Sequence, residues 1–226
     1  MRKYAVIVAG GSGTRMGGGI PKQFRDLCGR PVLWWSMKAF HDEDPDTSIV
    51  LVLPSEHISL WKELLGALPE KDRFCHQIAE GGETRSESVS NGLSIIGDED
   101  AWVAVHDGAR PLVTAEIISR GWHTILQNNA AIPAVPVTDS LREVSGNLSH
   151  SVDRSKFMAV QTPQFFSVAL LKEAYGKSRG KSFTDDAAVI ENAGGTVTLF
   201  EGSPLNLKIT NPQDLVIAEV LMNRDA

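Results

Sequence analysis

The stretch that decides the fold begins with Tyr4-Ala-Val-Ile-Val-Ala9 and continues into Gly10-Gly-Ser-Gly-Thr-Arg-Met-Gly-Gly-Gly-Ile-Pro-Lys22. The apolar run is typical of a buried strand. The loop after it is rich in glycine, which has no Cβ and therefore lets backbone N–H groups approach a ligand closely. The loop also carries two fixed cations, Arg15 and Lys22. Amide groups together with two positive charges suit a polyphosphate, so the sequence predicts a phosphate-binding loop after the first strand.

Two better-known glycine loops do not fit this stretch. The dinucleotide fingerprint needs a third glycine three residues after the second, but Gly11 and Gly13 are followed by Met16. The P-loop needs a Gly-Lys-Ser/Thr sequence that no register of the loop supplies. A glycine cluster alone fits a mobile surface turn equally well. The preceding strand and the paired cations favour phosphate binding over that alternative.

Composition and charge narrow the class of protein. The chain has 226 residues, of which 42% are hydrophobic and 22% are charged, as expected of a globular domain with a full core. A formal charge of −6 argues against nucleic-acid binding but permits an anionic small substrate. No apolar run is long enough to span a membrane. The first predicted strand leaves no room for a targeting peptide, and Cys28 and Cys75 show no metal-ligand spacing; we therefore expect a cytoplasmic protein.

Strand-like and helix-like patterns alternate along the chain, which is typical of a doubly wound, mostly parallel sheet flanked by helices. We expect a single Rossmann-like α/β domain over residues 1–226. Two prolines in the strand expected at residues 130–137 favour a place near a sheet edge. The other strands are expected at residues 4–9, 48–53, 73–79, 101–105 and 196–200, and the helices at 31–40, 56–68, 115–127, between Thr184 and Gly195, from Thr210 onward, and around an apolar face of Val89, Leu93 and Ile96.

The segment 138–157 departs from this pattern. Alternating polar and apolar residues on both sides of a Ser145-Gly-Asn147 turn predict a β-hairpin that protrudes from the domain as an arm. Two short strands have no core of their own, so the arm needs a partner surface. A second copy of the chain is the economical source of that surface. The sequence therefore predicts a homodimer formed through the arm.

Three polar motifs follow predicted strands, namely the first loop, Gly81–Ser88 and His106-Asp-Gly-Ala-Arg110. Ligands of open α/β sheets bind beyond the carboxyl ends of the strands, so we expect these motifs to share one site. Asp107 suits Mg²⁺, although capping a turn is the commoner use of an aspartate after a strand. His106 more often packs or orients backbone than catalyses, and Arg110 fits either a phosphate contact or a structural ion pair.

Other polar residues in these motifs have two interpretations each. Gly82 permits close approach of a ribose or a base. Ser88 fits a base contact or a surface helix position, and Arg85 fits a solvated position or a stabiliser of the loop. Lys208 lies in an apolar alternation that predicts a short strand. Pointing inward it would need an anionic partner, whereas the commoner position for a lysine faces solvent.

Taken together, these motifs resemble a known family. The loop from Gly10 to Gln23 resembles the signature of sugar-phosphate nucleotidyltransferases. The ribitol-5-phosphate cytidylyltransferases share several of the motifs, but the placement of Val152-Asp-Arg154 well before Thr162 favours the 2-C-methyl-D-erythritol 4-phosphate cytidylyltransferases of the non-mevalonate isoprenoid pathway. The resemblance spans nearly the entire chain and rests on Gly81–Ser88, His106–Pro111, Val152–Arg154, Thr162–Phe165, Thr184-Asp185 and Asn206–Ile209.

The resemblance implies a nucleotidyltransferase fold and a reaction in which the phosphate of the sugar alcohol attacks the α-phosphorus of CTP and pyrophosphate leaves. Arg15 and Lys22 would stabilise the transition state, and Arg154 and Lys208 would position the attacking phosphate. Asp107 would help to hold Mg²⁺. The implied CTP-binding residues are Ala9, Gly10, Gly11, Gly82, Glu83, Ser88, Asp107 and Gly108, and those for the sugar phosphate are Asp139, Ser140, Arg154, Thr162, Thr184 and Lys208.

The resemblance also implies a homodimer in which the arm of one subunit reaches the site of the other, so that Asp139, Ser140 and Arg154 would serve the neighbouring subunit. Three positions depart from the family pattern: Thr138, where arginine is frequent, Ser140, where threonine is frequent, and Gly108, where alanine is usual. Ser140 keeps a hydroxyl, so we expect altered tuning rather than lost activity.

Two functions of other classes fit the sequence less well. A nucleotide sensor without catalysis would not need cations for two phosphates, and a dinucleotide oxidoreductase would need the missing third glycine.

Overall fold

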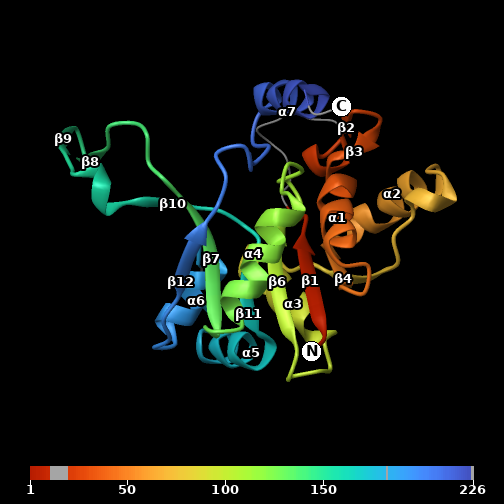
Figure 1. Cartoon of the computed structure of the whole chain (residues 1–226), viewed down its shortest axis with the longest axis horizontal. Coiled ribbons are helices and arrows are strands. Elements are labelled where there is room, and N and C mark those ends of the chain that lie inside the picture. Colours follow the sequence, from red (N-terminus) through yellow and green to blue (C-terminus); the bar gives the residue numbers. More distant parts are fainter. Residues whose placement is uncertain (11–19, 182, 225–226) are drawn as a thin grey trace.

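The protein is described by a computed structural model that covers residues 1–10, 20–181 and 183–224. At its centre lies an eight-stranded sheet with the order β10-β7-β11-β6-β1-β4-β5, in which β12 also pairs with β7 (Figure 1). Four strands are parallel neighbours, in line with the predicted mostly parallel sheet. They are β1 (Lys3–Val8), β4 (Ser48–Leu53), β5 (His76–Glu80) and β6 (Trp102–Asp107).

The other half of the sheet mixes strand directions. β11 (Gln164–Ser167) runs antiparallel between β6 and β7 (Ala130–Pro136). β10 (Met158–Val160) pairs antiparallel with β7, and β12 (Thr198–Glu201) pairs parallel with it. The proline-containing strand β7 lies next to the edge strands β10 and β12, which confirms the prediction that it is near an edge of the sheet. Its Pro133 lies opposite the break between β10 and β11, where the ladder is interrupted, and the Pro133 carbonyl still accepts a hydrogen bond from Gln161 N at 2.9 Å.

Side chains of β1 alternate between two hydrophobic cores, one on each face of the sheet. Ala5 and Ile7 belong to the first core, whereas Val6 and Val8 belong to the second. Helices therefore cover both faces, as the doubly wound pattern predicts. The first core includes residues of α1 (Val32–Glu43), α2 (Ser55–Gly66) and α4 (Ala115–Ile125), and the second includes residues of α3 (Arg85–Ser94), α5 (Val168–Lys177) and α6 (Asp186–Asn192).

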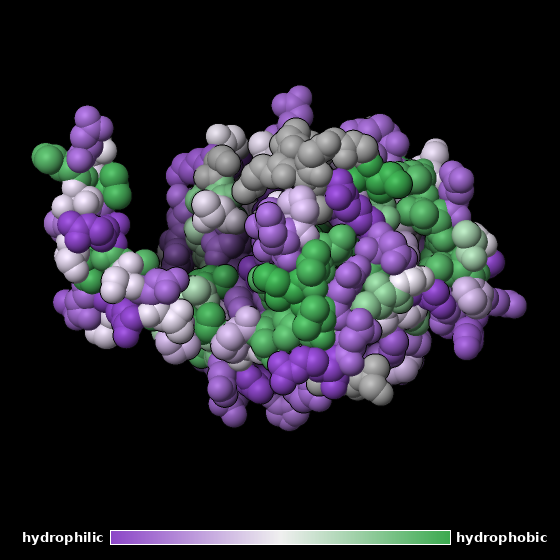
Figure 2. Space-filling model, turned by 90° about the horizontal axis from the view of Figure 1, so that it is seen from above, coloured by the Kyte–Doolittle hydropathy of each residue, from purple (hydrophilic) through white to green (hydrophobic). Residues whose placement is uncertain are grey.

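The expected arm is present and projects away from the sheet (Figures 1 and 2). Its hairpin consists of β8 (Arg142–Ser145) and β9 (Leu148–Ser151), within the predicted bounds 138–157. Every residue of both strands is exposed, including the apolar Val144 and Leu148. The hairpin therefore has no core within its own chain.

A last helix lies across the carboxyl end of the parallel strands (Figure 1). It is α7 (Pro212–Arg224), and its Ala218 packs in a small core with Leu27 and Ile209. Among the described residues, none of the helices has the length and apolar character needed to cross a membrane. The shorter elements are η2 (Lys22–Phe24), β2 (Asp26–Leu27), β3 (Arg30–Pro31), η3 (Glu70–Asp72) and η4 (Arg154–Lys156).

Two local expectations are corrected. The predicted short strand around Lys208 does not form. Ile209 N donates a hydrogen bond to Ala109 O at 2.8 Å, but no further strand pairing follows. The third strand begins at His76 rather than at Arg73, whose side chain turns back to donate to Leu68 O at 2.8 Å. Strands β10 and β11 and helix α5 were not predicted.

The substitution Gly121→Ala is expected to lower the free energy of unfolding by about 3 kcal/mol, because overpacked cores cost that much. A Cβ on this α4 residue would lie 2.0 Å from the ring of Phe165, which is fully buried. The matched control is Gly176→Ala on α5, where a Cβ would meet nothing within 4 Å and alanine should stabilise the helix by about 0.5–1 kcal/mol. Urea unfolding measures both changes, and equal midpoints would contradict the prediction.

Candidate active site

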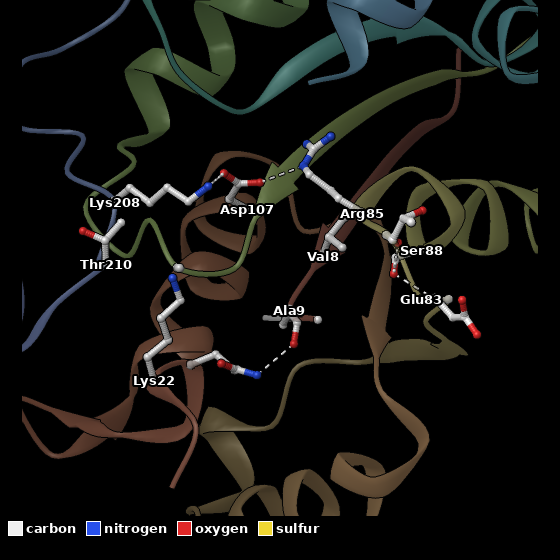
Figure 3. A pocket seen from close by; sticks show the side chains of 14 residues that line it. Val8, Ala9, Lys22, Glu83, Arg85, Ser88, Asp107, Lys208 and Thr210 are labelled. Atoms are coloured by element: carbon white, nitrogen blue, oxygen red, sulfur yellow. Dashed lines mark hydrogen bonds and ion pairs between the residues drawn. The ribbon is translucent and has the colours of Figure 1, made fainter. Parts of the chain in front are cut away.

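A pocket of about 290 Å³ opens at the carboxyl ends of β1 and β6 (Figure 3). The chain leaves β1 for β4 on one side, while β6 lies on the other, so the pocket occupies the switch point of the sheet. The three motifs expected to share a site are therefore brought together here. The lining residues are Val8, Ala9, Gly10, Lys22, Gln23, Gly82, Glu83, Thr84, Arg85, Ser88, Asp107, Ala109, Lys208 and Thr210.

The loop that precedes α3 forms one wall of the pocket and is tightly fixed. Thr84 caps α3, and its side chain and that of Glu87 form a reciprocal capping box. Ser88 is buried, its Oγ accepts a hydrogen bond from Gly82 N at 3.1 Å, and its hydroxyl donates to Thr84 O at 2.9 Å. The surface position considered for Ser88 is thus wrong. A Cβ on Gly82 would lie 2.3 Å from Glu87 Cβ, so this turn requires glycine.

Asp107 lies at the centre of a cluster of charges. Its Oδ2 accepts a hydrogen bond from Lys208 Nζ at 2.7 Å, and its Oδ1 lies 3.3 Å from Arg85 Nε. Burial would raise the pKa of Asp107, but Arg85, Lys208 and Arg110 outweigh it and hold the pKa well below the usual range. The carboxylate is therefore ionised at neutral pH. Of the two positions considered for Lys208, the one with an anionic partner is correct.

Arg110 forms the structural ion pair considered from the sequence. Its Nε lies 3.9 Å from Asp107 Oδ2, and its Nη1 donates to Asn206 O at 2.7 Å. Arg110 does not line the pocket. It therefore ties the Asp107 loop to the segment that carries Lys208.

His106 packs in the core, in line with the commoner of its two expected uses. The ring is fully buried, with Nδ1 3.2 Å from Thr162 Oγ1 and Nε2 3.3 Å from Arg110 O. A carbonyl only accepts, so Nε2 carries the proton and Nδ1 accepts from the Thr162 hydroxyl. Burial is the main cause that lowers the pKa of His106 to about 4.

Stability is expected to fall on acidification because of His106. Its pKa in the folded state is about 4, below the ordinary value of 6.5, so the unfolded chain takes up the proton first as the pH falls. The contribution of His106 to the free energy of unfolding is complete above pH 6.5. It declines as the pH falls from 6.5 to 4, by about 3 kcal/mol in all. Urea unfolding between pH 7 and 4 should show a weaker pH dependence in His106→Gln. The exposed His123→Gln should keep the wild-type dependence, and an identical dependence in both variants would contradict the prediction.

Lys22 reaches the pocket from η2, on the side opposite the Ser88 wall (Figure 3). Its Nζ donates to Ile209 O at 2.7 Å, next to Lys208 in the chain. The neighbouring Gln23 donates through Nε2 to Ala9 O at 2.8 Å and so ties η2 to the end of β1. Lys22 and Lys208 thus enter one pocket from opposite ends of the sequence. Gly11 and Arg15 lie outside the described residues.

Three implied ligand residues do not line the pocket. Thr162 is buried, and its Oγ1 accepts a hydrogen bond from Asp107 N at 3.0 Å, which fixes the Asp107 backbone. Gly108 packs against the core, where a Cβ would lie 2.7 Å from Leu33 Cδ1. Thr184 is exposed just before α6. By contrast, Ala9, Gly10, Gly82 and Glu83 line the pocket as implied.

The three implied arm residues are exposed and lie outside this pocket; they are Asp139, Ser140 and Arg154. The Arg154 guanidinium donates to Thr138 O at the base of the arm. The arm points away from the body of its own chain (Figure 2). A single chain therefore does not bring these residues to its own pocket.

Sequence reasoning underrated Arg85 and missed Thr210. Arg85 lines the pocket and pairs with Asp107 and Asp186, so it is not the solvated residue considered above. Thr210 lines the pocket, and its N and Oγ1 donate to Asp214 Oδ2. The sequence did predict that the last helix starts near Thr210, and α7 begins at Pro212; only the place of Thr210 in the pocket was not predicted.

Comparisons with known proteins agree with this architecture. The sequence pattern of a family described as 2-C-methyl-D-erythritol 4-phosphate cytidylyltransferase matches residues 4–224. A protein of that name from Bacteroides thetaiotaomicron is 45% identical over 98% of this chain and 100% of its own. Another, from Porphyromonas gingivalis, is 43% identical over 98% of both chains.

Solved structures give the same result. The crystal structure of 2-C-methyl-D-erythritol 4-phosphate cytidylyltransferase from Thermus thermophilus is similar with a TM-score of 0.79 and 35% identity, over 99% of this chain and 100% of that one. The 4-diphosphocytidyl-2C-methyl-D-erythritol synthase from Anaerococcus prevotii is similar with a TM-score of 0.83 and 25% identity, over 99% and 96%. With its pocket, its arm and these full-length matches, this chain belongs to the 2-C-methyl-D-erythritol 4-phosphate cytidylyltransferase family of nucleotidyltransferases.

Proposed function

We propose that this chain transfers CMP from CTP to 2-C-methyl-D-erythritol 4-phosphate. A phosphate oxygen of the sugar alcohol attacks the α-phosphorus of CTP, the bond from that phosphorus to the β-phosphate oxygen breaks, and pyrophosphate leaves with the bonding electrons. The product is 4-diphosphocytidyl-2-C-methyl-D-erythritol. Because the nucleophile is already an anion, the reaction depends on positioning and charge stabilisation more than on a strong base.

The observation that carries this proposal is the meeting of Lys22 and Lys208 in one pocket. Two anions must approach each other in the reaction, and cations on both offset their repulsion. Lys22 adjoins the predicted phosphate loop and would stabilise charge on the triphosphate. Lys208 comes from the segment before α7 and would hold the attacking phosphate. Arg15 shares the proposed role of Lys22.

The Ser88 wall suits the cytidine end of CTP. Ser88 Oγ already accepts one hydrogen bond and donates another, so a single lone pair is left for a ligand donor. The exocyclic amine of cytosine is such a donor. The N–H groups of Gly82 and Glu83 are used inside the loop, where Glu83 N donates to Glu87 Oε2 at 2.8 Å. We therefore assign base recognition to Ser88 Oγ and to backbone carbonyls of this wall, with Ala9 and Gly10 on the ribose side.

Mg²⁺ fits the pocket through Asp107 together with the substrate. Among the described residues, no group of three His, Cys, Asp or Glu side chains could hold a metal ion by itself. Mg²⁺ needs fewer protein ligands than that, since it commonly binds through one or two carboxylates and the substrate phosphates. Asp107 is ionised and lines the pocket. When bound, the ion would withdraw charge from the triphosphate, with Asp107 as its protein ligand.

The arm supports a homodimer in which each subunit completes the site of the other. Val144 and Leu148 are 70% and 78% exposed, which is costly for a hairpin that stays in water. Arg154, Asp139 and Ser140 lie on or beside the arm, outside the pocket of their own chain. A neighbouring chain would bury the apolar residues and receive Arg154 near the attacking phosphate, with the exposed Thr184 of the pocket subunit beside the sugar.

We propose the cytoplasm as the location of the protein. Cys28 and Cys75 are both free thiols, which is compatible with a reducing compartment.

The proposed function is tested by pyrophosphate release from CTP with two alternative acceptors. We expect turnover with 2-C-methyl-D-erythritol 4-phosphate, and a kcat/KM for ribitol 5-phosphate lower by about a hundredfold or more, since a site that hydrogen-bonds its substrate rejects analogues strongly. A higher kcat/KM with ribitol 5-phosphate would reassign the substrate. Absence of pyrophosphate release with both acceptors would remove the catalytic proposal.

A further inference from the structure

The charge cluster in the pocket continues into the interior through Arg85. Arg85 Nη2 lies 2.7 Å from Oδ2 of Asp186, the first residue of α6, which is fully buried. The other oxygen of Asp186 accepts a hydrogen bond from the Tyr175 hydroxyl at 2.6 Å. Asp186 N donates to Gln164 Oε1 at 3.0 Å. Both the backbone and the carboxylate of Asp186 are therefore held in place.

Arg85 is a permanent bridge between two carboxylates. Burial disfavours its charge, but Asp186 and Asp107 together raise its pKa above the ordinary value. Its planar guanidinium contacts Asp107 through Nε and Asp186 through Nη2. A lysine, with one nitrogen, could not span both in this way. Because Asp186 is fixed by α6 and Tyr175, the end of Arg85 that contacts Asp107 is fixed as well.

Two cations form hydrogen bonds with different oxygens of Asp107, while the third, Arg110, lies farther away at 3.9 Å. Arg85 contacts Oδ1, and Lys208 donates to Oδ2, from opposite sides of the carboxylate (Figure 3). An arginine without a second partner tends to take both oxygens of a carboxylate in a bidentate pair. Such a pair here would compete with Lys208 for Oδ2. The anchor at Asp186 holds Arg85 back from this arrangement.

We propose that Arg85 is a positioning residue: anchored by Asp186, it holds Asp107 so that Oδ2 stays directed at Lys208 and thereby sets the place of the Lys208 ammonium that receives the attacking phosphate. This inference rests on the proposed function, because Lys208 is assigned to the phosphate of the sugar alcohol there. In this role Arg85 and Asp186 contribute to the specificity for the sugar phosphate. Neither residue contacts the reacting atoms in this role.

The test compares two substitutions of nearly unchanged size on the same helix. Asp186→Asn removes the charge that anchors Arg85, whereas Glu191→Gln removes a charge from an exposed side chain of α6. In Asp186→Asn, KM for 2-C-methyl-D-erythritol 4-phosphate should rise about tenfold, with KM for CTP changed less than about threefold. Glu191→Gln should leave both KM values within about twofold, because substitutions of exposed side chains away from the site have small effects.

The KM values separate positioning from mere support of the fold, because a destabilised enzyme loses active molecules and kcat but keeps its KM. The double variant Arg85→Met/Asp186→Asn should be no worse than Arg85→Met, since Asp186 acts through Arg85. If Asp186→Asn does not fold, Tyr175→Phe, which removes only one hydrogen bond to Asp186, must show the same selective rise in smaller measure.

The inference would be overturned by an unchanged KM for the sugar phosphate in the folded variants, or by additive losses in the double variant. The proposed function would still stand as long as the wild-type enzyme transfers CMP. Absence of wild-type CMP transfer would remove both.

Discussion

Lys22→Ala is expected to lower kcat/KM for CMP transfer by about a thousandfold, the effect of removing one preorganised donor from a transition state. The Lys22 ammonium enters the pocket beside Lys208 and is held by Ile209 O. Charge that develops as the α-phosphorus is attacked would then lack one of its fixed counter-charges. Because Lys22 is only half-buried, we expect the fold to persist, with a loss of about 1 kcal/mol from the hydrogen bond between Lys22 Nζ and Ile209 O.

Steady-state kinetics with pyrophosphate detection measure this change, with thermal unfolding as the check on folding. The matched control is Lys38→Ala, which removes a lysine that pairs with Asp42 on the outer face of α1. Its activity should equal that of the wild type. A Lys22→Ala variant within about threefold of wild-type kcat/KM would exclude Lys22 from transition-state stabilisation.

Mixing two inactive variants is expected to restore activity. Arg154→Ala damages the arm and Lys22→Ala damages the pocket, and Arg154 lies outside the pocket of its own chain. In a dimer of one chain of each kind, the Arg154→Ala chain keeps an intact pocket and receives an intact arm from its partner. The other site lacks both residues. Purified heterodimer should therefore show about half the wild-type kcat, since one of two equivalent sites is complete.

The control for this experiment is a heterodimer that should be inactive if the arm acts on the neighbouring subunit. A chain carrying both Lys22→Ala and Arg154→Ala is paired with a wild-type chain. If arms act on neighbouring pockets, each site then lacks one cation, and the heterodimer should be inactive. If each arm acts on its own chain, the wild-type subunit should give about half activity in this pairing and the two single variants should not complement. Two affinity tags isolate both heterodimers.

Much of the fold follows from local patterns in the sequence. The alternation in β1, with Ile7 and Val6 on opposite faces, predicts a sheet covered by helices on both sides, and that arrangement is observed. The polar hairpin around Gly146, whose φ is +59°, was also predictable. The antiparallel strands β10 and β11 were not, because three or four residues carry no reliable period and a break at Thr162-Pro163 separates them.

Helix α5 was not predicted, although its sequence carries a helical pattern. Its Val168, Leu171 and Ala174 recur at helical spacing and are all buried. This face predicts a helix over the residues that form α5, Val168–Lys177.

Only part of the site could be predicted from the sequence. Glycine-rich turns after strands, and a lysine at the end of such a loop, predict where the pocket lies because the carboxyl ends of parallel strands share one edge. The partnership of Arg85 with Asp186 was beyond such reasoning. These residues are 101 positions apart, and nothing in the spacing of either shows that one contacts the other. Only the packing of α6 against α5 and β11 puts a buried carboxylate within reach of the pocket.

Gly108 couples the loop beside the pocket to the packing of the core. A Cβ at this position would lie 2.7 Å from Leu33 Cδ1, and Leu33 is completely buried. Alanine at this position would therefore require the end of the Leu33 side chain to shift, and a smaller residue 33 would make room for it. We expect the two positions to vary together among relatives. A change in the loop beside the nucleotide pocket thus depends on how α1 packs in the core.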